Sequence, residues 1–220
     1  MKKRAKTISG QGALDGIEDS DFLLSYEFFQ GSTLDTARNL LGRRLWRKLP
    51  DGSVLHGPIV EVEAYTEDDP ACHAYRGETP RCRVLFGPPG HAYIYFIYGM
   101  YHCLNLVTEP EGKAGAVLIR AVGAEGTNGP GRLCRQWSID KSLNGVDMTR
   151  SDSPIWLSRG SRVADSDVET TARIGLSVAV DRLWRFAVKD HASVSGPAKV
   201  IPRIRKKRNA SSDGGRGAGK

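Results

Sequence analysis

Two glutamates in one apolar stretch are the first residues whose type and spacing could do chemistry. Glu61 and Glu63 alternate with Val60, Val62 and Ala64, so in an extended strand both carboxylates point to one face. A carboxylate partly covered by aromatic groups can serve as a general base, a role worth roughly 10²–10⁴ in rate. Two acids about 7 Å apart on one strand are also compatible with a sugar hydrolase that uses paired carboxylates. A solvated strand face without chemistry is the third interpretation.

A single arginine interrupts a second, very apolar stretch. Arg120 lies within residues 117–121, between Ile119 and Ala121, and an arginine in such a strand needs an acid or a phosphate as partner. Glu63 is its natural partner, in either a catalytic pair or a structural one. Asn105, flanked by two leucines, must make hydrogen bonds if buried, either to lock strands or to read the edge of a base.

Residues 92–107 contain two runs of aromatic and β-branched residues joined at Gly99-Met100, a pattern that predicts a β-hairpin. Four of the chain's seven tyrosines lie in it, namely Tyr93, Tyr95, Tyr98 and Tyr101. A buried tyrosine hydroxyl needs a partner, so a purely structural hairpin would use fewer of them. The hairpin is therefore predicted to protrude and to stack on flat rings.

The elements around these residues predict a single α+β domain with a mainly antiparallel, curved sheet and short helices. In residues 54–65, the alternation places Ile59 on the same face as Glu61 and Glu63. Residues 66–90 are a long loop, which in a compact domain is usually functional. Strands are expected at 43–49, 54–65, 116–121, 154–157 and 183–188; helices at 33–41, after a Ser32 or Thr33 cap, and 132–139; and a weak helix or loop at 168–173.

The composition is that of an ordinary globular protein. The chain has 220 residues, of which 40% are hydrophobic and 26% charged, and its apolar runs are far shorter than a membrane span. No apolar signal core follows the basic N-terminus, so we expect an intracellular protein without membrane contact. Four spread cysteines without a CxxC pair favour free thiols and match no compact zinc motif. We therefore expect neither a metal nor a cofactor.

The net charge of +7 is concentrated at the two ends. Residues 1–12 carry four basic side chains and no acid, whereas residues 199–220 carry eight basic side chains and one acid. The stretch between them is slightly acidic. We expect disordered basic arms at 1–18 and 201–220 around a folded domain at 19–200. Such arms suit attraction to phosphates, or simply keep the protein in solution.

Taken together, the residues resemble one family closely, the alkyladenine (3-methyladenine) DNA glycosylases of the mammalian and Bacillus type. The resemblance runs from about Leu24 to Lys199. The matching pieces are Glu27-Phe28-Phe29, Ala37-Arg38-Asn39-Leu40-Leu41-Gly42, Ile59-Val60-Glu61-Val62-Glu63-Ala64-Tyr65, Thr79-Pro80-Arg81, Tyr98-Gly99-Met100-Tyr101, Leu118-Ile119-Arg120-Ala121, Asn128-Gly129-Pro130, Ile139-Asp140-Lys141-Ser142 and Arg173-Ile174-Gly175.

The resemblance implies a monomeric, monofunctional glycosylase of base excision repair. Its partner would be double-stranded DNA with alkylated or deaminated purines, in a prokaryotic cytoplasm or a eukaryotic nucleus. Water attacks the sugar of the flipped nucleotide, with Glu63 as base and Arg120 and the backbone carbonyl of Ile174 holding the water. The implied base pocket consists of Tyr65, His73, Tyr95, Asn105 and Leu118, and the implied DNA contacts are Tyr98 as wedge, Met100 beside it and Lys141.

The sequence departs from that family at three places. Only residues 122–127 separate Ala121 from Asn128, where the family usually has a longer segment; the loop from Glu63 to His73 is one residue shorter than in mammalian members; and Ala116 replaces a cysteine. These departures bear on contacts around the site and on lesion preference. A non-catalytic nucleic-acid-binding module is the alternative to an enzyme, and base release distinguishes the two.

Overall fold

The computed structural model describes residues 23–196. The predicted arms at 1–18 and 201–220, and the outer ends of the predicted domain, lie outside the described residues.

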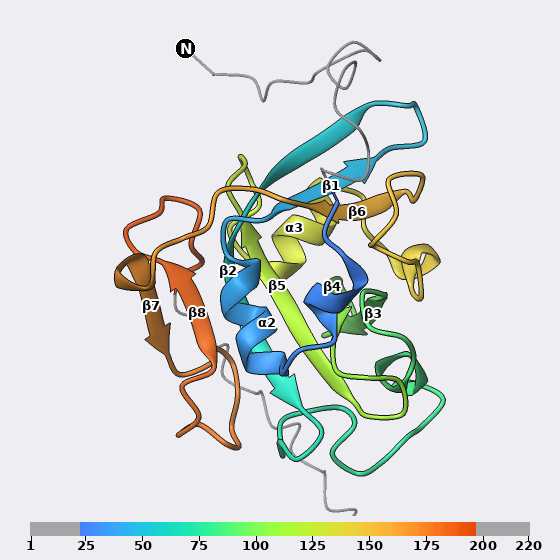
Figure 1. Cartoon of the computed structure of the whole chain (residues 1–220), viewed down its shortest axis with the longest axis vertical. Helices are drawn as coiled ribbons and strands as arrows, with labels where there is room; N and C mark the ends of the chain where they lie inside the picture. Colours follow the sequence, from blue (N-terminus) through green and yellow to red (C-terminus); the bar gives the residue numbers. More distant parts are fainter. Residues whose placement is uncertain (1–22, 197–220) are drawn as a thin grey trace, which may run out of the picture.

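An antiparallel sheet organises the chain (Figure 1). Its strand order is β3-β4-β5-β2-β1-β6, and β8 pairs with both β2 and β7. The long strand β2 therefore pairs with three other strands, β1, β5 and β8, and the sheet curls around it. The predicted α+β domain with a mainly antiparallel, curved sheet is confirmed. The strands are β1 Arg44–Lys48, β2 Val54–Thr66, β3 Ala92–Ile97, β4 Tyr101–Val107, β5 Gly115–Val122, β6 Ile155–Ser158, β7 Val168–Thr171 and β8 Arg185–Val188.

Within residues 23–196, two α-helices cover the sheet. Helix α2 (Thr33–Leu40) packs against β2 and β5, and α3 (Pro130–Gln136) packs against β4 and β5. Of the two caps predicted for α2, Ser32 is the one used, because its hydroxyl accepts the N–H of Asp35 at 3.2 Å. Such a cap satisfies one of the free donors at a helix start. The main hydrophobic core lies between these helices and the sheet. No helix within residues 23–196 is long and apolar enough to cross a membrane.

Strand β2 contains a bulge that the alternation did not predict. The pairing with β5 shifts register on either side of Glu61, and an extra residue of this kind reverses the faces that follow it. Ile59 consequently joins the core with Val62 and Ala64. The expectation that Ile59 shares the face of Glu61 and Glu63 was wrong for this reason.

Residues 168–171 form a strand instead of the predicted weak helix or loop. Strand β7 pairs with β8 along its whole length, from Val168↔Val188 to Thr171↔Arg185. Its exposed Glu169 and Thr170 give no apolar alternation. The partner strand, 14 or more residues away in the chain, supplies the structure that the local sequence does not. The long loop at 66–90 is confirmed, with a short 3₁₀ helix, η3, at Arg83–Phe86.

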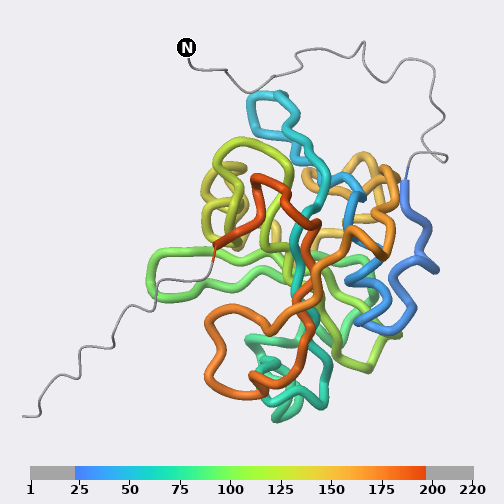
Figure 2. Tube along the Cα trace, turned by 90° about the vertical axis from the view of Figure 1, so that its left-hand side faces the viewer, coloured from blue at the N-terminus to red at the C-terminus, as the bar shows by residue number. Residues whose placement is uncertain are grey.

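The tyrosine-rich hairpin of β3 and β4 is confirmed and projects from the body of the molecule (Figure 2). Ile97 pairs with Tyr101, and the Ile97 carbonyl accepts the N–H of Met100 at 3.2 Å. Tyr98 and Gly99 both have positive φ, 55° and 69°, as a type I′ turn requires. Tyr98 is 75% exposed and Met100 64% exposed. The turn thus presents two large apolar side chains to solvent.

Candidate active site

The register of the sheet brings the candidate residues into one row. Tyr93 pairs with Asn105, Asn105 with Leu118, Leu118 with Glu63, and Glu63 with Arg185. Directly opposite residues in antiparallel strands project from the same face. Five strands therefore align side chains that are far apart in the sequence.

Glu63 is completely buried, and three donors surround its carboxylate. Oε1 accepts the backbone N–H of Ile174 at 2.8 Å and lies 3.1 Å from Nη1 of Arg120, while Oε2 accepts the hydroxyl of Tyr65 at 2.8 Å. Hydrogen bonds of this kind stabilise a buried ionised carboxylate. The predicted pairing of Arg120 with Glu63 is confirmed. The structure brings Ile174 to the site by its amide, and this amide contact to Glu63 was not predicted.

Arg120 also binds the other glutamate. Its Nε donates to Glu61 at 2.9 Å, and Arg185 donates to the same oxygen at 2.7 Å. Ser195 adds its backbone N–H at 2.7 Å and its hydroxyl at 2.8 Å to the Glu61 carboxylate. Two acids and two arginines thus form a chain, Glu63–Arg120–Glu61–Arg185, of balanced charge.

The charges and hydrogen bonds of the cluster shift the pKa values of Glu61, Arg120 and Tyr65. Burial alone would raise the pKa of Glu61, but Arg120, Ser195 and Arg185 outweigh burial and lower it. Burial likewise opposes the charge of Arg120, yet Glu63 and Glu61 raise its pKa above the ordinary value. Burial and the neighbouring Glu63 raise the pKa of Tyr65 well above its usual range. Tyr65 is therefore a proton donor to Glu63 at neutral pH.

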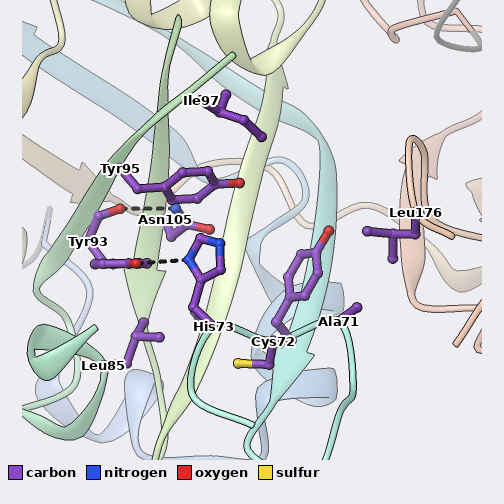
Figure 3. Close-up of a pocket in the computed structure, with 11 residues that line it drawn as sticks. Ala71, Cys72, His73, Leu85, Tyr93, Tyr95, Ile97, Asn105 and Leu176 are labelled. Carbon is purple, nitrogen blue, oxygen red and sulfur yellow. Dashed lines mark hydrogen bonds between the residues drawn. The ribbon is translucent and has the colours of Figure 1, made fainter. Parts of the chain in front are cut away.

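A cavity of about 130 Å³ opens beside this cluster (Figure 3). Tyr65, His73, Tyr95 and Asn105, all predicted for a base pocket, line it, whereas Leu118 lies in the row between Asn105 and Glu63 but not in the cavity lining. The further lining residues are Ala71, Cys72, Leu85, Tyr93, Ile97, Ala116 and Leu176.

Aromatic rings and a fixed amide shape this cavity. His73 packs edge-on against Tyr95 with ring centres 4.6 Å apart, and its Nδ1 lies 2.9 Å from the hydroxyl of Tyr93. The Nδ2 of Asn105 donates to the carbonyls of Tyr93 at 3.0 Å and Cys103 at 3.4 Å. Asn105 therefore does lock strands, and because its amide nitrogen is held by the backbone, its oxygen is the polar atom left toward the cavity (Figure 3).

The remaining predicted residues lie outside the cavity. Tyr98 and Met100 occupy the exposed hairpin tip. Lys141 is exposed at the start of a 3₁₀ helix, η4 (Lys141–Leu143), which packs against β3 of the hairpin. All four cysteines are free and buried, as the absence of a CxxC pair predicted.

Several residues that contact Glu61 or Tyr65 were not predicted as site residues from the sequence. Arg185 and Ser195 hold Glu61, and Asp69 and Arg173 form a buried ion pair next to Tyr65. Arg173 was visible only as part of the Arg173-Ile174-Gly175 motif. An arginine within the apolar alternation at 183–188 was the one available hint for Arg185.

Comparison with known proteins assigns the family. A family model described as methylpurine-DNA glycosylase (MPG) matches residues 27–192. Three similar proteins carry the provisional name 3-methyladenine DNA glycosylase. They come from Herpetosiphon aurantiacus (42% identical over 196 residues, 79% of this chain and 89% of the relative), Carboxydothermus hydrogenoformans (42% over 190 residues, 79% and 98%) and Sodalis glossinidius (46% over 173 residues, 76% and 97%). The chain thus belongs to the methylpurine-DNA glycosylase family, and it is a DNA glycosylase, a hydrolase of N-glycosyl bonds.

Proposed function

We propose that this glycosylase releases alkylated or deaminated purines, such as 3-methyladenine, hypoxanthine and ethenoadenine, from double-stranded DNA. The damaged nucleotide leaves the duplex and its base enters the aromatic cavity. Glu63 accepts a proton from a water molecule, whose oxygen attacks C1′ as the bond from C1′ to the base nitrogen breaks. The bonding electrons leave with the base, and an abasic site remains. The enzyme acts as a monomer and requires no amine nucleophile.

The observation that carries this proposal is the link between Glu63 and the cavity. Tyr65 lines the cavity and donates its hydroxyl to the Glu63 carboxylate at 2.8 Å. A base held against the ring of Tyr65 would therefore bring its sugar toward Glu63. Arg120 and the Ile174 amide hold the carboxylate from the other side. In this proposal Arg120 and the Ile174 backbone also hold the attacking water.

The cavity walls suit flat, electron-poor rings. Alkylated adenines carry positive charge, which tyrosine faces attract, and a stacked base gains roughly 1–3 kcal/mol. Leu118 supports the pocket from the strand row, between Asn105 and Glu63. Flipping costs a few kcal/mol, less for a base that pairs poorly. Tyr98 would fill the gap in the duplex, with Met100 beside it and Lys141 on the DNA backbone.

Two alternatives from the sequence lose support. A sugar hydrolase would need Glu61 as a free acid, but both oxygens of Glu61 are bound by Arg120, Arg185 and Ser195. A binding module without catalysis does not account for the buried Glu63–Arg120 pair next to the cavity.

An inosine-containing duplex tests the proposal. After incubation with the protein, the strand should break at inosine only when hot alkali is added, and free hypoxanthine should appear by chromatography. Binding without alkali-labile sites would indicate a binding module. Breakage before alkali would contradict a monofunctional enzyme.

Replacing Tyr98 by Asn should separate fold stability from DNA insertion. A positive φ costs a side chain such as tyrosine about 1–2 kcal/mol, and asparagine tolerates it better, so the variant should unfold at the same or a higher urea concentration. Without the inserted ring, affinity for a lesion duplex should fall about 5- to 150-fold, the worth of one stacked base. Undiminished lesion affinity, measured by fluorescence anisotropy, would contradict the wedge role.

Replacing Asn105 by Ser should relax discrimination against guanine. Backbone carbonyls hold the Asn105 amide in place, so it cannot move aside for the 2-amino group of guanine. Serine removes that crowding, and the variant should release guanine while still releasing hypoxanthine. Chromatography of the released bases is the measurement. If hypoxanthine release continued without any guanine release, Asn105 would not be the residue that excludes guanine.

A further inference from the structure

A second buried ion pair lies next to Tyr65, outside the Glu63–Arg120 cluster and outside the cavity lining. The side chains of Asp69 and Arg173 are both fully buried. Both terminal nitrogens of Arg173 donate to the Asp69 carboxylate, Nη2 to Oδ1 at 3.1 Å and Nη1 to Oδ2. Asp69 follows the end of β2, whereas Arg173 follows β7. The pair therefore joins two loops that are 104 residues apart in the sequence.

Arg173 contacts the strand that carries the proposed general base. Its Nη1 donates at 2.9 Å to the carbonyl of Ala64, the residue between Glu63 and Tyr65. Its guanidinium lies 4.6 Å from the centre of the Tyr65 ring. The next residue, Ile174, donates its backbone N–H to Glu63. The Arg173 side chain thus holds the backbone directly after Glu63, and Arg173 directly precedes the residue whose amide binds the Glu63 carboxylate.

The two loops joined by the pair also form cavity walls. Asp69 Oδ1 accepts the N–H of Ala71 at 3.1 Å, and the Asp69 carbonyl accepts the N–H of Cys72 at 2.8 Å. These contacts shape the turn that leads to His73. Leu176, from the loop that follows Arg173, also lines the cavity, on the side away from Tyr93 and Tyr95 (Figure 3).

Stability alone is a poor explanation for this pair, because the cost of removing two charges from water often exceeds their attraction. A bidentate arginine instead gives geometric specificity, which a hydrophobic pair of similar size cannot. We propose that the Asp69–Arg173 pair is a positioning device for catalysis: it sets the Glu63 carboxylate, the Tyr65 ring and the two wall loops in register. This inference rests on the proposed function, and neither residue touches the reacting atoms.

Two variants and one control test the proposal. Asp69→Leu with Arg173→Met replaces the pair by apolar side chains, which should preserve folding while removing the bidentate contact. Arg173→Lys keeps the charge but offers one nitrogen in place of the two that contact Asp69, Ala64 and Ala179. Arg182→Met is the matched control. Arg182 also stacks on Trp184, at 4.4 Å, and lies 3.9 Å from Asp69, but its Nη2 donates to the carbonyl of Asp68, at 3.4 Å, and not to that of Ala64.

The assay is single-turnover release of hypoxanthine with enzyme in excess over duplex DNA. A purely structural defect reduces the amount of folded enzyme, but it leaves the rate constant unchanged as long as the folded enzyme still saturates the DNA. Loss of positioning instead lowers the rate constant at full amplitude. We expect a fall of about 100-fold in the rate constant for the double variant and for Arg173→Lys, as a misplacement near 1 Å can produce. Arg182→Met should change it by less than about fivefold, the scale of a partly exposed ion pair.

The outcomes separate this inference from the proposed function. If the wild-type protein released no base, the proposed function itself would fail. If the wild type were active and both pair variants reacted at its rate, or if Arg182→Met slowed the reaction as much as they did, the positioning inference would be overturned. Should the double variant not fold by circular dichroism, Arg173→Lys alone decides.

Discussion

Replacing Glu63 by Gln should lower the rate of hypoxanthine release by about 10²–10⁴-fold, the usual worth of a general base. Glutamine has the same shape, so its oxygen can still accept the Ile174 amide, but it cannot take a proton from water. Arg120 keeps Glu61 as its partner at 2.9 Å, so the buried arginine remains paired and the variant should fold. The measurement is the single-turnover rate constant on an inosine-containing duplex.

Lesion binding and an exposed glutamate provide the controls for this variant. Glu63→Gln should bind the inosine duplex within about fivefold of the wild type, because the cavity walls are unchanged. Glu78→Gln makes the same chemical change at a partly exposed ion pair with Arg83 and should leave the rate unaltered. A Glu63→Gln enzyme that remained as fast as the wild type would show that another group activates the water.

Replacing Glu61 by Gln should mainly destabilise the fold. Glu61 is completely buried and its carboxylate is shared by Arg120 and Arg185, whose side chains are each 8% exposed. Removing one partner of a buried ion pair costs about 3–5 kcal/mol, because charge is left uncompensated. For a chain of this size that corresponds to a fall in Tm of about 6–20 °C. Thermal unfolding followed by circular dichroism is the measurement, and an unchanged Tm would show that Glu61 is not needed to balance the arginines.

The pH dependence of stability gives Glu61 a distinct signature. Its folded-state pKa is lowered: burial opposes ionisation, but Arg120, Ser195 and Arg185 prevail. The stabilisation from its charge is therefore fully present above the ordinary glutamate pKa and is lost as the pH falls through the lowered folded value. The difference in unfolding free energy between wild type and Glu61→Gln should be constant at neutral pH and shrink in acid. A difference that persisted at the lowest pH at which both proteins fold would contradict this account.

The sequence predicted the elements whose local patterns are strong. The hairpin followed from its aromatic runs and turn, the start of α2 from Ser32, and the Glu63–Arg120 pair from a charge in each of two apolar strands. These features depend on residues near one another or on the need of a buried charge for a partner. The family resemblance supplied the pocket residues that composition alone left ambiguous, such as His73.

The features that the sequence missed depend on tertiary context. The bulge in β2 moves Ile59 into the core and is set by the pairing with β5. Strand β7 exists because β8 lies beside it. The contacts of Ser195 with Glu61, and of Asp69 with Arg173, span more than 100 residues. No local pattern encodes such contacts, because Ser195, Asp69 and Arg173 are ordinary loop residues in their own segments.

The central claim, that water and not a protein amine attacks the sugar, is tested most directly by borohydride trapping on an inosine duplex. An amine nucleophile would form an imine with the sugar, which borohydride reduces to a stable protein–DNA adduct. We predict free hypoxanthine, an intact strand until alkali is added, and no adduct beyond the background that the protein forms with an abasic duplex prepared without it. A trapped adduct that forms at the rate of base release would contradict it.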